Sequence, residues 1–196
     1  KRQVPTQLVR LLEAGRGAAL RRYDAILLGG AASPPALLDR AADAGVRVCT
    51  TYGMSETAGG CVYDGQPLNG TTVELDDDRI TLRGSTVALG YLGDPELTEQ
   101  AFDGAGGFRT GDLGTFVDGR LQVLGRADDL INTGGMKVAP RVVEDALTRL
   151  PGVREAVVLG LPDPEWGQVV SAALWLTSGS KLYGGLAVSY THLTLP

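Results

Sequence analysis

The sequence predicts an α/β fold in which a parallel βαβ layer is joined to a small antiparallel sheet or barrel and followed by the start of a compact α+β domain. Two apolar runs, residues 23–28 and 46–51, flank a helical stretch. This strand–helix–strand succession over about 30 residues predicts two parallel strands. From Gly70 onward, short segments alternate between apolar and polar residues and are separated by turn residues, which is typical of antiparallel hairpins.

The first part of the chain predicts two helices around the first strand. Residues 6–13 place three leucines on one helical face. Ser33 precedes two prolines, a pattern that predicts Ser33 as the N-cap of a helix with proline in its first turn. This second helix ends at Gly45, and the strand after it leads directly into Tyr52 and Gly53.

The later part predicts short strands interrupted by two helices. The expected elements are strands at 71–75 and 79–83, a helix at 95–102, two short strands within 108–124, a helix at 140–150 and strands at 153–160 and 168–176.

The pattern changes near residue 126, where we expect a domain boundary. The predicted organisation is a first domain over residues 1–125, a hinge at 126–128, an incomplete small α+β domain at 129–176 and a tail at 177–196. The tail contains no Asp, Glu or Arg, so we expect it to lie outside the fold. Because Lys1 begins in the middle of a helical pattern, we expect the chain to be a fragment.

Composition excludes several classes of function. The chain of 196 residues has 18 basic and 23 acidic side chains and a net charge of −5, without the basic block that a nucleic-acid partner needs. No apolar run reaches the roughly 18 to 20 residues of a membrane span, and no signal peptide opens the chain. One histidine and two cysteines leave little material for a histidine-activated nucleophile or a metal cluster. Two free thiols in such a chain favour the cytoplasm.

Three glycine-punctuated clusters contain residues that could carry chemistry. Residues 52–57 follow a predicted parallel strand at its carboxyl end, where ligands bind in open α/β sheets. There Glu56 suits a magnesium-bound polyphosphate, and Ser55 or Thr57 could donate to phosphate. The alternative is an ordinary polar loop.

The second cluster spans residues 108–112. Its glycine turn could fix Asp112 so that the carboxylate accepts from both hydroxyls of a ribose, although Asp112 could instead cap a β-turn. The third cluster spans residues 125–137. Its Arg126 and Asp128 form either an interdomain salt bridge or a hinge that handles an anionic ligand.

Three motifs follow one another in the order Tyr-Gly-x-Ser-Glu, Arg-Thr-Gly-Asp and Gly-Arg-x-Asp-Asp. After them come Gly-Gly and a helix that begins with proline and contains Glu144. Together they resemble the motifs of the adenylate-forming superfamily. Its members include acyl-CoA synthetases, the adenylation domains of peptide synthetases and luciferases. The resemblance covers residues 1–176 and implies that residues 1–125 are the C-terminal part of the large AMP-binding domain. Within the superfamily, residues 59–68 and 132–138 resemble the o-succinylbenzoate–CoA ligases of menaquinone biosynthesis.

The resemblance implies an ATP-dependent ligase that joins a small-molecule carboxylic acid to CoA through an acyl-adenylate, with Mg²⁺ as cofactor. It also implies a role for individual residues. Glu56 holds magnesium and Ser55 contacts phosphate. Gly29, Gly30 and Ala31 form the wall of the adenine pocket, Tyr52 stacks near adenine, and Gly53 lets the backbone pass close to the acyl group. Asp112 binds the ribose, Arg126 reaches the nucleotide, Asp128 is the hinge residue, and Gly134, Gly135 and Lys137 contact CoA.

Two features of the superfamily have no match in this sequence: the Ser/Thr/Gly-rich phosphate loop and the lysine near the carboxyl end. Lys181 lies in the tail without the matching context. Because loss of one preorganised donor costs about 10² to 10³ in rate, we expect this polypeptide alone to catalyse no detectable adenylation. The alternatives are a medium-chain, long-chain or aryl acyl-CoA synthetase, an amino-acid-activating adenylation domain, and a nucleotide-binding remnant without catalysis. The sequence does not indicate an oligomeric state.

Overall fold

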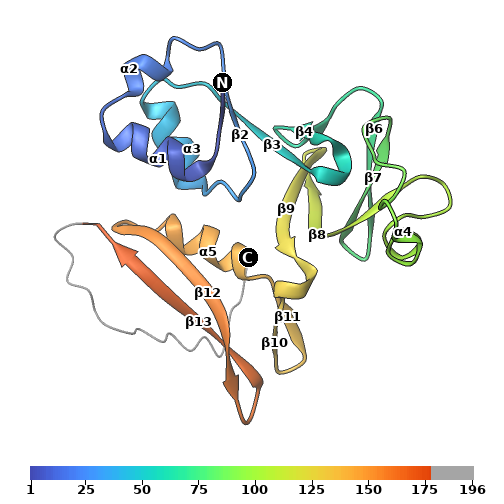
Figure 1. Ribbon diagram of the computed structural model, residues 1–196. Coiled ribbons are helices and arrows are strands. Elements are labelled where there is room, and N and C mark those ends of the chain that lie inside the picture. Colours follow the sequence, from blue (N-terminus) through green and yellow to red (C-terminus); the bar gives the residue numbers. More distant parts are fainter. Residues whose placement is uncertain (178–196) are drawn as a thin grey trace. The chain divides into compact units, whose positions relative to one another are not determined.

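The computed structural model describes residues 1–177. The described part of the chain forms two compact units, which divide between Val123 and Leu124 (Figure 1). The division falls just before the predicted hinge at 126–128, and the predicted tail lies outside the described residues except for Thr177. No helix in the described part of the chain is long and apolar enough to cross a membrane.

The first unit begins with a five-stranded sheet in the order β1-β2-β3-β4-β5. The parallel pairing of β2 with β3 confirms the βαβ prediction, and β1 adds parallel to β2, whereas β4 and β5 add antiparallel. The elements are β1 (Arg2–Gln3), α1 (Pro5–Glu13), α2 (Gly17–Leu20), β2 (Ile26–Leu28), α3 (Pro35–Asp43), β3 (Val48–Met54), β4 (Gly59–Tyr63) and β5 (Gln66–Pro67).

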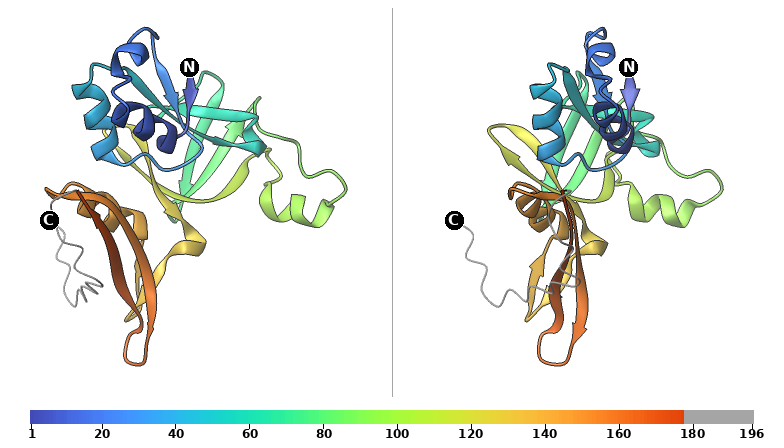
Figure 2. Two further views of the ribbon diagram at one scale, coloured as in Figure 1. Left: turned by 60° about the vertical axis from the view of Figure 1, so that its left-hand side comes forward. Right: turned by 90° about the vertical axis from the view of Figure 1, so that its left-hand side faces the viewer.

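Helices α1, α2 and α3 gather beside strands β1 to β3 (Figure 2) and bury an apolar core with them. The buried side chains of this core are Leu8, Leu20, Ile26, Leu28, Leu37, Ala41 and Val46. Burial of such a side chain stabilises a fold by about 1.5–3 kcal/mol, so the leucine face predicted for the first helix is what holds α1 on the sheet.

Three local predictions differ from the structure. The chain does not begin inside a helix, because Arg2–Gln3 form strand β1 and the first helix starts at Pro5. Ser33 is not the N-cap of α3: Pro34 occupies that position without a side-chain hydrogen bond. Its ψ of 138° is extended, as expected for a residue that precedes another proline, so the helix starts at Pro35. Strand β4 was not predicted, because Gly59 and Gly60 suggest a turn rather than a strand.

The second sheet of this unit is antiparallel and has the order β6-β7-β8-β9. Its hairpin β6–β7 and the helix α4 beside it were predicted within a few residues. The strands expected to be short are longer, at 10 residues for β8 and 7 for β9. The elements are β6 (Thr71–Asp76), β7 (Arg79–Gly84), α4 (Pro95–Ala101), β8 (Phe108–Val117) and β9 (Arg120–Arg126). Ile80, Leu82 and Leu121 of this sheet share one core with Cys61 and Val62 of β4.

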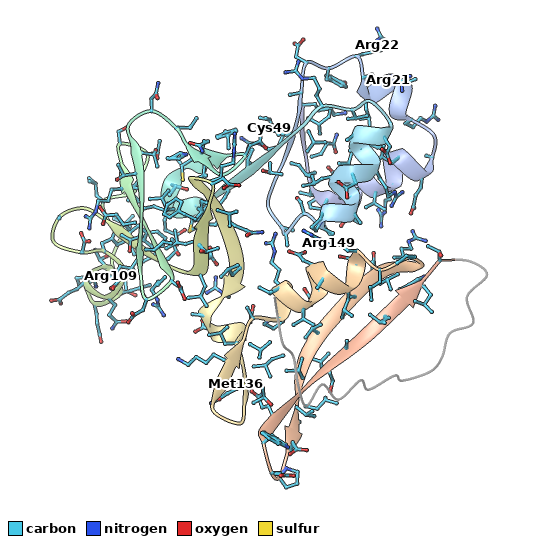
Figure 3. The ribbon with its side chains drawn as sticks, turned by 180° about the vertical axis from the view of Figure 1, so that it is seen from behind. Arg21, Arg22, Cys49, Arg109, Met136 and Arg149 are labelled. Atoms are coloured by element: carbon cyan, nitrogen blue, oxygen red, sulfur yellow. The ribbon has the colours of Figure 1, made fainter. Side chains whose placement is uncertain are left out.

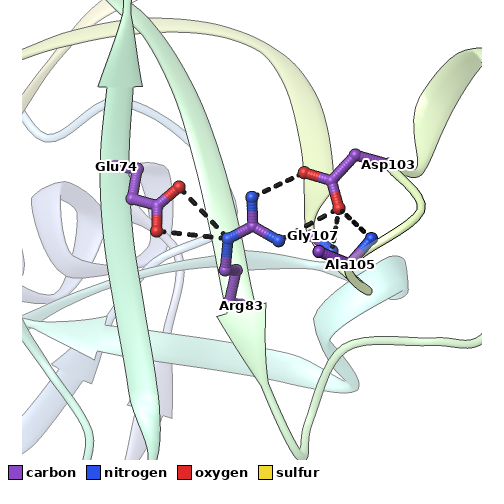
Figure 4. A network of polar contacts seen from close by, with 5 residues as sticks. All are labelled: Glu74, Arg83, Asp103, Ala105 and Gly107. Carbon is purple, nitrogen blue, oxygen red and sulfur yellow. Dashed lines mark hydrogen bonds and ion pairs between the residues drawn. The ribbon is translucent and has the colours of Figure 1, made fainter.

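A charged network fastens the turn that precedes β8 (Figure 4). Arg83 on β7 lies between two carboxylates, 3.1 Å from Glu74 and 2.6 Å from Asp103. Asp103 also accepts from the backbone N–H groups of Gly107 at 2.8 Å and Ala105 at 3.0 Å. The hydrogen bonds from Arg83, followed by those from the backbone, hold the pKa of Asp103 well below its usual range.

The second unit has an antiparallel sheet in the order β11-β10-β13-β12, with α5 packed on it. The helix and the two long strands were predicted, but the β10–β11 hairpin was not. Glu144 of α5 accepts from the N–H of Val158 on β12 at 2.8 Å, which ties the helix to the sheet. The elements are β10 (Ile131–Thr133), β11 (Met136–Val138), α5 (Pro140–Thr148), β12 (Val153–Asp163) and β13 (Gly167–Leu176).

Candidate functional site

Strand β3 ends in a 3₁₀ turn, η1 (Ser55–Thr57), which carries two of the predicted site residues. Thr57 is only 1% exposed. Its hydroxyl accepts from the N–H of Met54 at 2.9 Å and donates to the carbonyl of Gly59 at 2.7 Å. Thr57 therefore holds the turn together, and of the two hydroxyls left open as phosphate donors, that of Ser55 is the exposed one.

Gly53 lies where β3 and β4 approach most closely. The register shifts between Tyr52 and Gly53, and a Cβ atom at Gly53 would overlap the carbonyl of Gly59. The close packing of β3 on β4 therefore requires glycine at position 53, independently of any role toward the acyl group.

The structure joins two predicted site residues that are 60 positions apart in sequence. The Tyr52 hydroxyl donates to Asp112 Oδ2 at 2.8 Å. Burial, and then the negative charge of Asp112, raise the pKa of Tyr52 well above its usual value, so the phenol stays protonated and remains a donor. The buried hydroxyl of Thr110 accepts from the Asp112 N–H at 3.0 Å and donates to the Ile80 carbonyl at 2.8 Å, which fixes the backbone of Asp112 on the sheet.

Glu56 has a partner that sequence reasoning missed. The hydroxyl of Tyr91 donates to Glu56 Oε1 at 2.8 Å, and the N–H of Ala88 donates to the Glu56 carbonyl oxygen at 2.7 Å. The hydrogen bond to Glu56, followed by burial, raises the pKa of Tyr91. No spacing rule links residues 56 and 91, and only the turn-rich character of residues 84–95 could have singled out this segment.

Gly29, Gly30 and Ala31 follow β2 at its carboxyl end. Gly29 is buried, and a Cβ atom there would overlap the side chain of Thr51 on β3. Thr51 immediately precedes Tyr52, so the structure brings Gly29 beside the strand segment that carries the tyrosine.

In the second unit, Arg126 and Asp128 lie at the start of a 3₁₀ turn, η2 (Ala127–Asp129). Their side chains form an ion pair of 3.6 Å and are 57% and 82% exposed. The pair is thus local to one turn, and such an exposed pair contributes only about 0–1 kcal/mol to stability.

The other predicted residues of this unit occupy the β10–β11 hairpin. Gly134 and Gly135 form its two-residue turn, with φ angles of +56° and +82°, as a type I′ turn requires. Lys137 is exposed on β11, as is Met136 beside it (Figure 3). The N–H of Gly134 donates to the Trp166 carbonyl at 2.9 Å, a contact that the sequence did not predict.

Comparison with known proteins shows which proteins the chain resembles. Residues 142–188 match the AMP-binding enzyme C-terminal domain. A probable 2-succinylbenzoate–CoA ligase of Mycobacterium tuberculosis is 46% identical over 181 residues, which cover 90% of this chain and 47% of the relative. A 4-hydroxybutyrate–CoA ligase of Metallosphaera sedula is 36% identical over 192 residues, covering 80% of this chain and 35% of the relative.

Solved structures agree with these relatives. The o-succinylbenzoate CoA synthetase of Bacillus subtilis, solved with its acyl-adenylate intermediate, has a TM-score of 0.76 at 32% identity and covers 92% of this chain and 42% of its own. An amide bond synthetase of Marinactinospora thermotolerans has a TM-score of 0.81 at 31% identity and covers 92% and 42%.

The chain belongs to the adenylate-forming superfamily, and the predicted fold class is that of the C-terminal part of these enzymes. It spans about a third to a half of the length of the curated relatives that it matches. Within the superfamily, the particular enzymes it resembles are the 2-succinylbenzoate–CoA ligases, with further matches in Salmonella typhimurium at 38% identity and Escherichia coli at 34%. The family match ends at residue 188, inside the tail set apart in the sequence analysis. That the tail lies outside the fold remains a prediction.

Proposed function

We propose that the chain is part of an ATP-dependent acid–CoA ligase whose acyl substrate is o-succinylbenzoate, in menaquinone biosynthesis. In the first half-reaction the substrate carboxylate attacks the α-phosphate of ATP, which forms acyl-AMP and releases pyrophosphate. In the second, the CoA thiol displaces AMP. The observation that carries the proposal is the hydrogen bond between Tyr52 and Asp112 on strands β3 and β8, with Ser55 and Glu56 directly beyond the end of β3.

This geometry supports a nucleotide site in the first unit. The Asp112 carboxylate, oriented by Tyr52, accepts from the ribose hydroxyls. The backbone of Gly29, Gly30 and Ala31 forms the wall of the adenine pocket beside Tyr52, and the exposed Ser55 hydroxyl donates to phosphate. Because two anions react, the protein is required to position them and stabilise charge rather than to supply a nucleophile.

Glu56 fits the magnesium ion of a Mg·ATP complex. Within residues 1–177 no group of three or more His, Cys, Asp or Glu could hold a metal without help, yet Mg²⁺ is usually held by one or two carboxylates together with substrate phosphates. Oε1 of Glu56 accepts from Tyr91, and among the described residues Oε2 has no donor. When bound, the ion neutralises phosphate charge, and Glu56 anchors it.

The second unit is proposed to supply the CoA contacts and the movement between half-reactions. Arg126 reaches the nucleotide, Asp128 is the hinge residue between a large domain at 1–125 and a small domain at 129–176, and the turn at Gly134 and Gly135, with Lys137, lies against CoA. The Arg126 and Asp128 side chains are 57% and 82% exposed, which supports a turn that a ligand can reach. Two free cysteines, Cys49 and Cys61, support a cytoplasmic protein.

The activity is tested in a chimera, because the chain spans 47% of its Mycobacterium tuberculosis relative. The matching segment of that relative is replaced by this chain, and ATP–pyrophosphate exchange and thioester formation are measured with o-succinylbenzoate. We expect both activities in the chimera, a loss of about 10²-fold or more with Glu56→Gln, and none from the chain alone. A chimera that stays fully active with Glu56→Gln and Asp112→Ala would contradict the proposed site.

The acyl substrate needs a second host. The same segment is placed in the Metallosphaera sedula 4-hydroxybutyrate ligase, and o-succinylbenzoate, 4-hydroxybutyrate and benzoate are compared as substrates. Gain of o-succinylbenzoate use supports acyl selectivity within this chain. Use of 4-hydroxybutyrate or benzoate alone in both hosts would contradict o-succinylbenzoate and favour a general acyl-CoA synthetase.

A further inference from the structure

The segment between β7 and α4 donates two hydrogen bonds to Glu56. The N–H of Ala88 donates to the Glu56 carbonyl at 2.7 Å, and the hydroxyl of Tyr91 donates to Oε1 of its side chain at 2.8 Å. The first contact only docks the segment on the turn η1. The second orients the carboxylate, which otherwise would move among several rotamers.

Tyr91 itself is held from two further sides. Its N–H donates to Thr98 Oγ1 at 2.8 Å, and the Thr98 hydroxyl donates to the carbonyl of Asp94 at 2.8 Å, the N-cap of α4. The Tyr91 ring meets the Phe102 ring edge to face, with centroids 5.7 Å apart and an interplanar angle of 70°. Backbone, ring and hydroxyl are thus each constrained.

The aromatic contacts continue to the start of the strand that carries the other predicted carboxylate, Asp112. Phe102, only 8% exposed, packs on Phe108 at a centroid distance of 5.0 Å. Phe108 begins strand β8, which carries Asp112 four residues later. The same packed layer therefore supports the tyrosine that holds Glu56 and the strand that holds Asp112.

From these contacts we propose that Tyr91 is a positioning residue that presents Glu56 to the magnesium ion of a Mg·ATP complex. The inference rests on the proposed function. Tyr91 binds Oε1 and leaves Oε2 for the ion, and it donates without adding a positive charge that would compete with the metal. Because Mg²⁺ demands near-ideal octahedral geometry, a carboxylate already fixed in place binds it better than one that must be ordered.

The test compares ATP affinity with and without Mg²⁺ in the full chain, by isothermal titration calorimetry. Tyr91→Phe keeps the ring and its contact with Phe102 but removes the hydroxyl. Tyr23→Phe, on an exposed tyrosine, is the matched control. We expect Tyr91→Phe to weaken Mg·ATP binding about tenfold, the lower end for a hydrogen bond to a charged group, and to leave metal-free ATP binding and the control unchanged.

A spectroscopic measurement tests whether the metal ion lies near Tyr91, and the thermal midpoint tests for a merely structural role. With Mn²⁺ in place of Mg²⁺ and ¹³C-labelled tyrosine rings, Mn·ATP is expected to broaden the Tyr91 resonance, assigned by its loss in Tyr91→Phe, and to leave that of Tyr23 sharp. The thermal midpoint of Tyr91→Phe without ligand is expected to stay close to that of the unaltered chain.

The possible outcomes distinguish a failure of the positioning role of Tyr91 from a failure of the proposed nucleotide site. If Tyr91→Phe weakens ATP binding equally with and without metal, or leaves both unchanged, the positioning role is overturned while the nucleotide site stands. The same holds if Mn·ATP binds and the Tyr91 resonance stays sharp. If the unaltered chain binds neither ATP nor Mg·ATP, the nucleotide site fails in this chain and the role of Tyr91 fails with it.

Discussion

The two glycines of the β10–β11 turn have different surroundings, so alanine at each position should have a different cost. Both have positive φ, at +56° and +82°. An added Cβ atom at Gly134 would lie 2.5 Å and 2.8 Å from two ring carbons of Trp166, whereas at Gly135 nothing lies within 4 Å. Gly135→Ala therefore measures backbone strain alone, and Gly134→Ala measures strain together with a clash.

The magnitudes follow from these two terms. A left-handed conformation costs a residue with a Cβ about 1–2 kcal/mol, and the reduced entropy of the unfolded chain returns about 0.4–1 kcal/mol. Gly135→Ala should thus lower the free energy of unfolding by about 0–1.6 kcal/mol. Gly134→Ala should lose a further ~1–3 kcal/mol, the usual cost of overpacking.

The assay is urea unfolding followed by tryptophan fluorescence in a Trp175→Phe background, so that Trp166 alone reports. We expect Gly134→Ala also to shift the Trp166 emission to longer wavelength in the folded state, because the ring must move away from the turn. In a Trp166→Ala background, with Trp175 kept as the reporter, the difference between the two alanine variants should vanish. Equal destabilisation by Gly134→Ala and Gly135→Ala in the presence of Trp166 would refute the reasoning.

Three further predictions follow. Asp112→Ala should weaken ATP binding to the chain by at least about tenfold, measured by calorimetry, while Asp39→Ala, on an exposed carboxylate of α3, should change nothing. Because Arg83 lowers the pKa of Asp103, the stability that Asp103 contributes is present above its unfolded pKa of about 4 and is lost as pH falls through the lower folded value. Asp103→Asn should therefore destabilise the chain at neutral pH, with a deficit in thermal midpoint that shrinks below about pH 4; a deficit independent of pH would contradict this. In the chimera, Gly135→Leu should spare pyrophosphate exchange and abolish thioester formation, and equal loss of both would contradict a contact with CoA.

Much of the fold could be predicted because it depends on local signals. The Asp-rich and Asp-Gly turns placed the β6–β7 and β8–β9 hairpins, and Asp94 with Pro95 placed α4, where the Asp94 side chain accepts from the N–H of Leu97 at 2.9 Å. The β4 strand and the β10–β11 hairpin were missed. The strand β4 lies against Gly53 of β3, and Gly134 of the hairpin lies against Trp166, contacts that no short-range pattern contains.

In the candidate site, too, some features could be predicted from the sequence and others could not. Motif residues could be singled out individually because glycine turns and polar side chains mark them in sequence. Their partners could not: the bonds from Tyr52 to Asp112 and from Tyr91 to Glu56 join residues 60 and 35 positions apart. Thr57 illustrates the reverse error, since its hydroxyl resembled a phosphate donor in sequence and is consumed by the turn that it stabilises.

The turns of the first unit also bear on the order in which it folds. Three of its hairpins close through two residues with positive φ, namely Asp64–Gly65, Asp77–Asp78 and Asp118–Gly119. Hairpins of this kind form in about 1–10 μs, whereas parallel strands β2 and β3 pair only after a helical crossover has closed, and such non-local pairing is slow. We therefore expect the strands synthesised first to complete their sheet last. The bond between Tyr52 and Asp112, which spans both sheets, would then be among the final contacts to form.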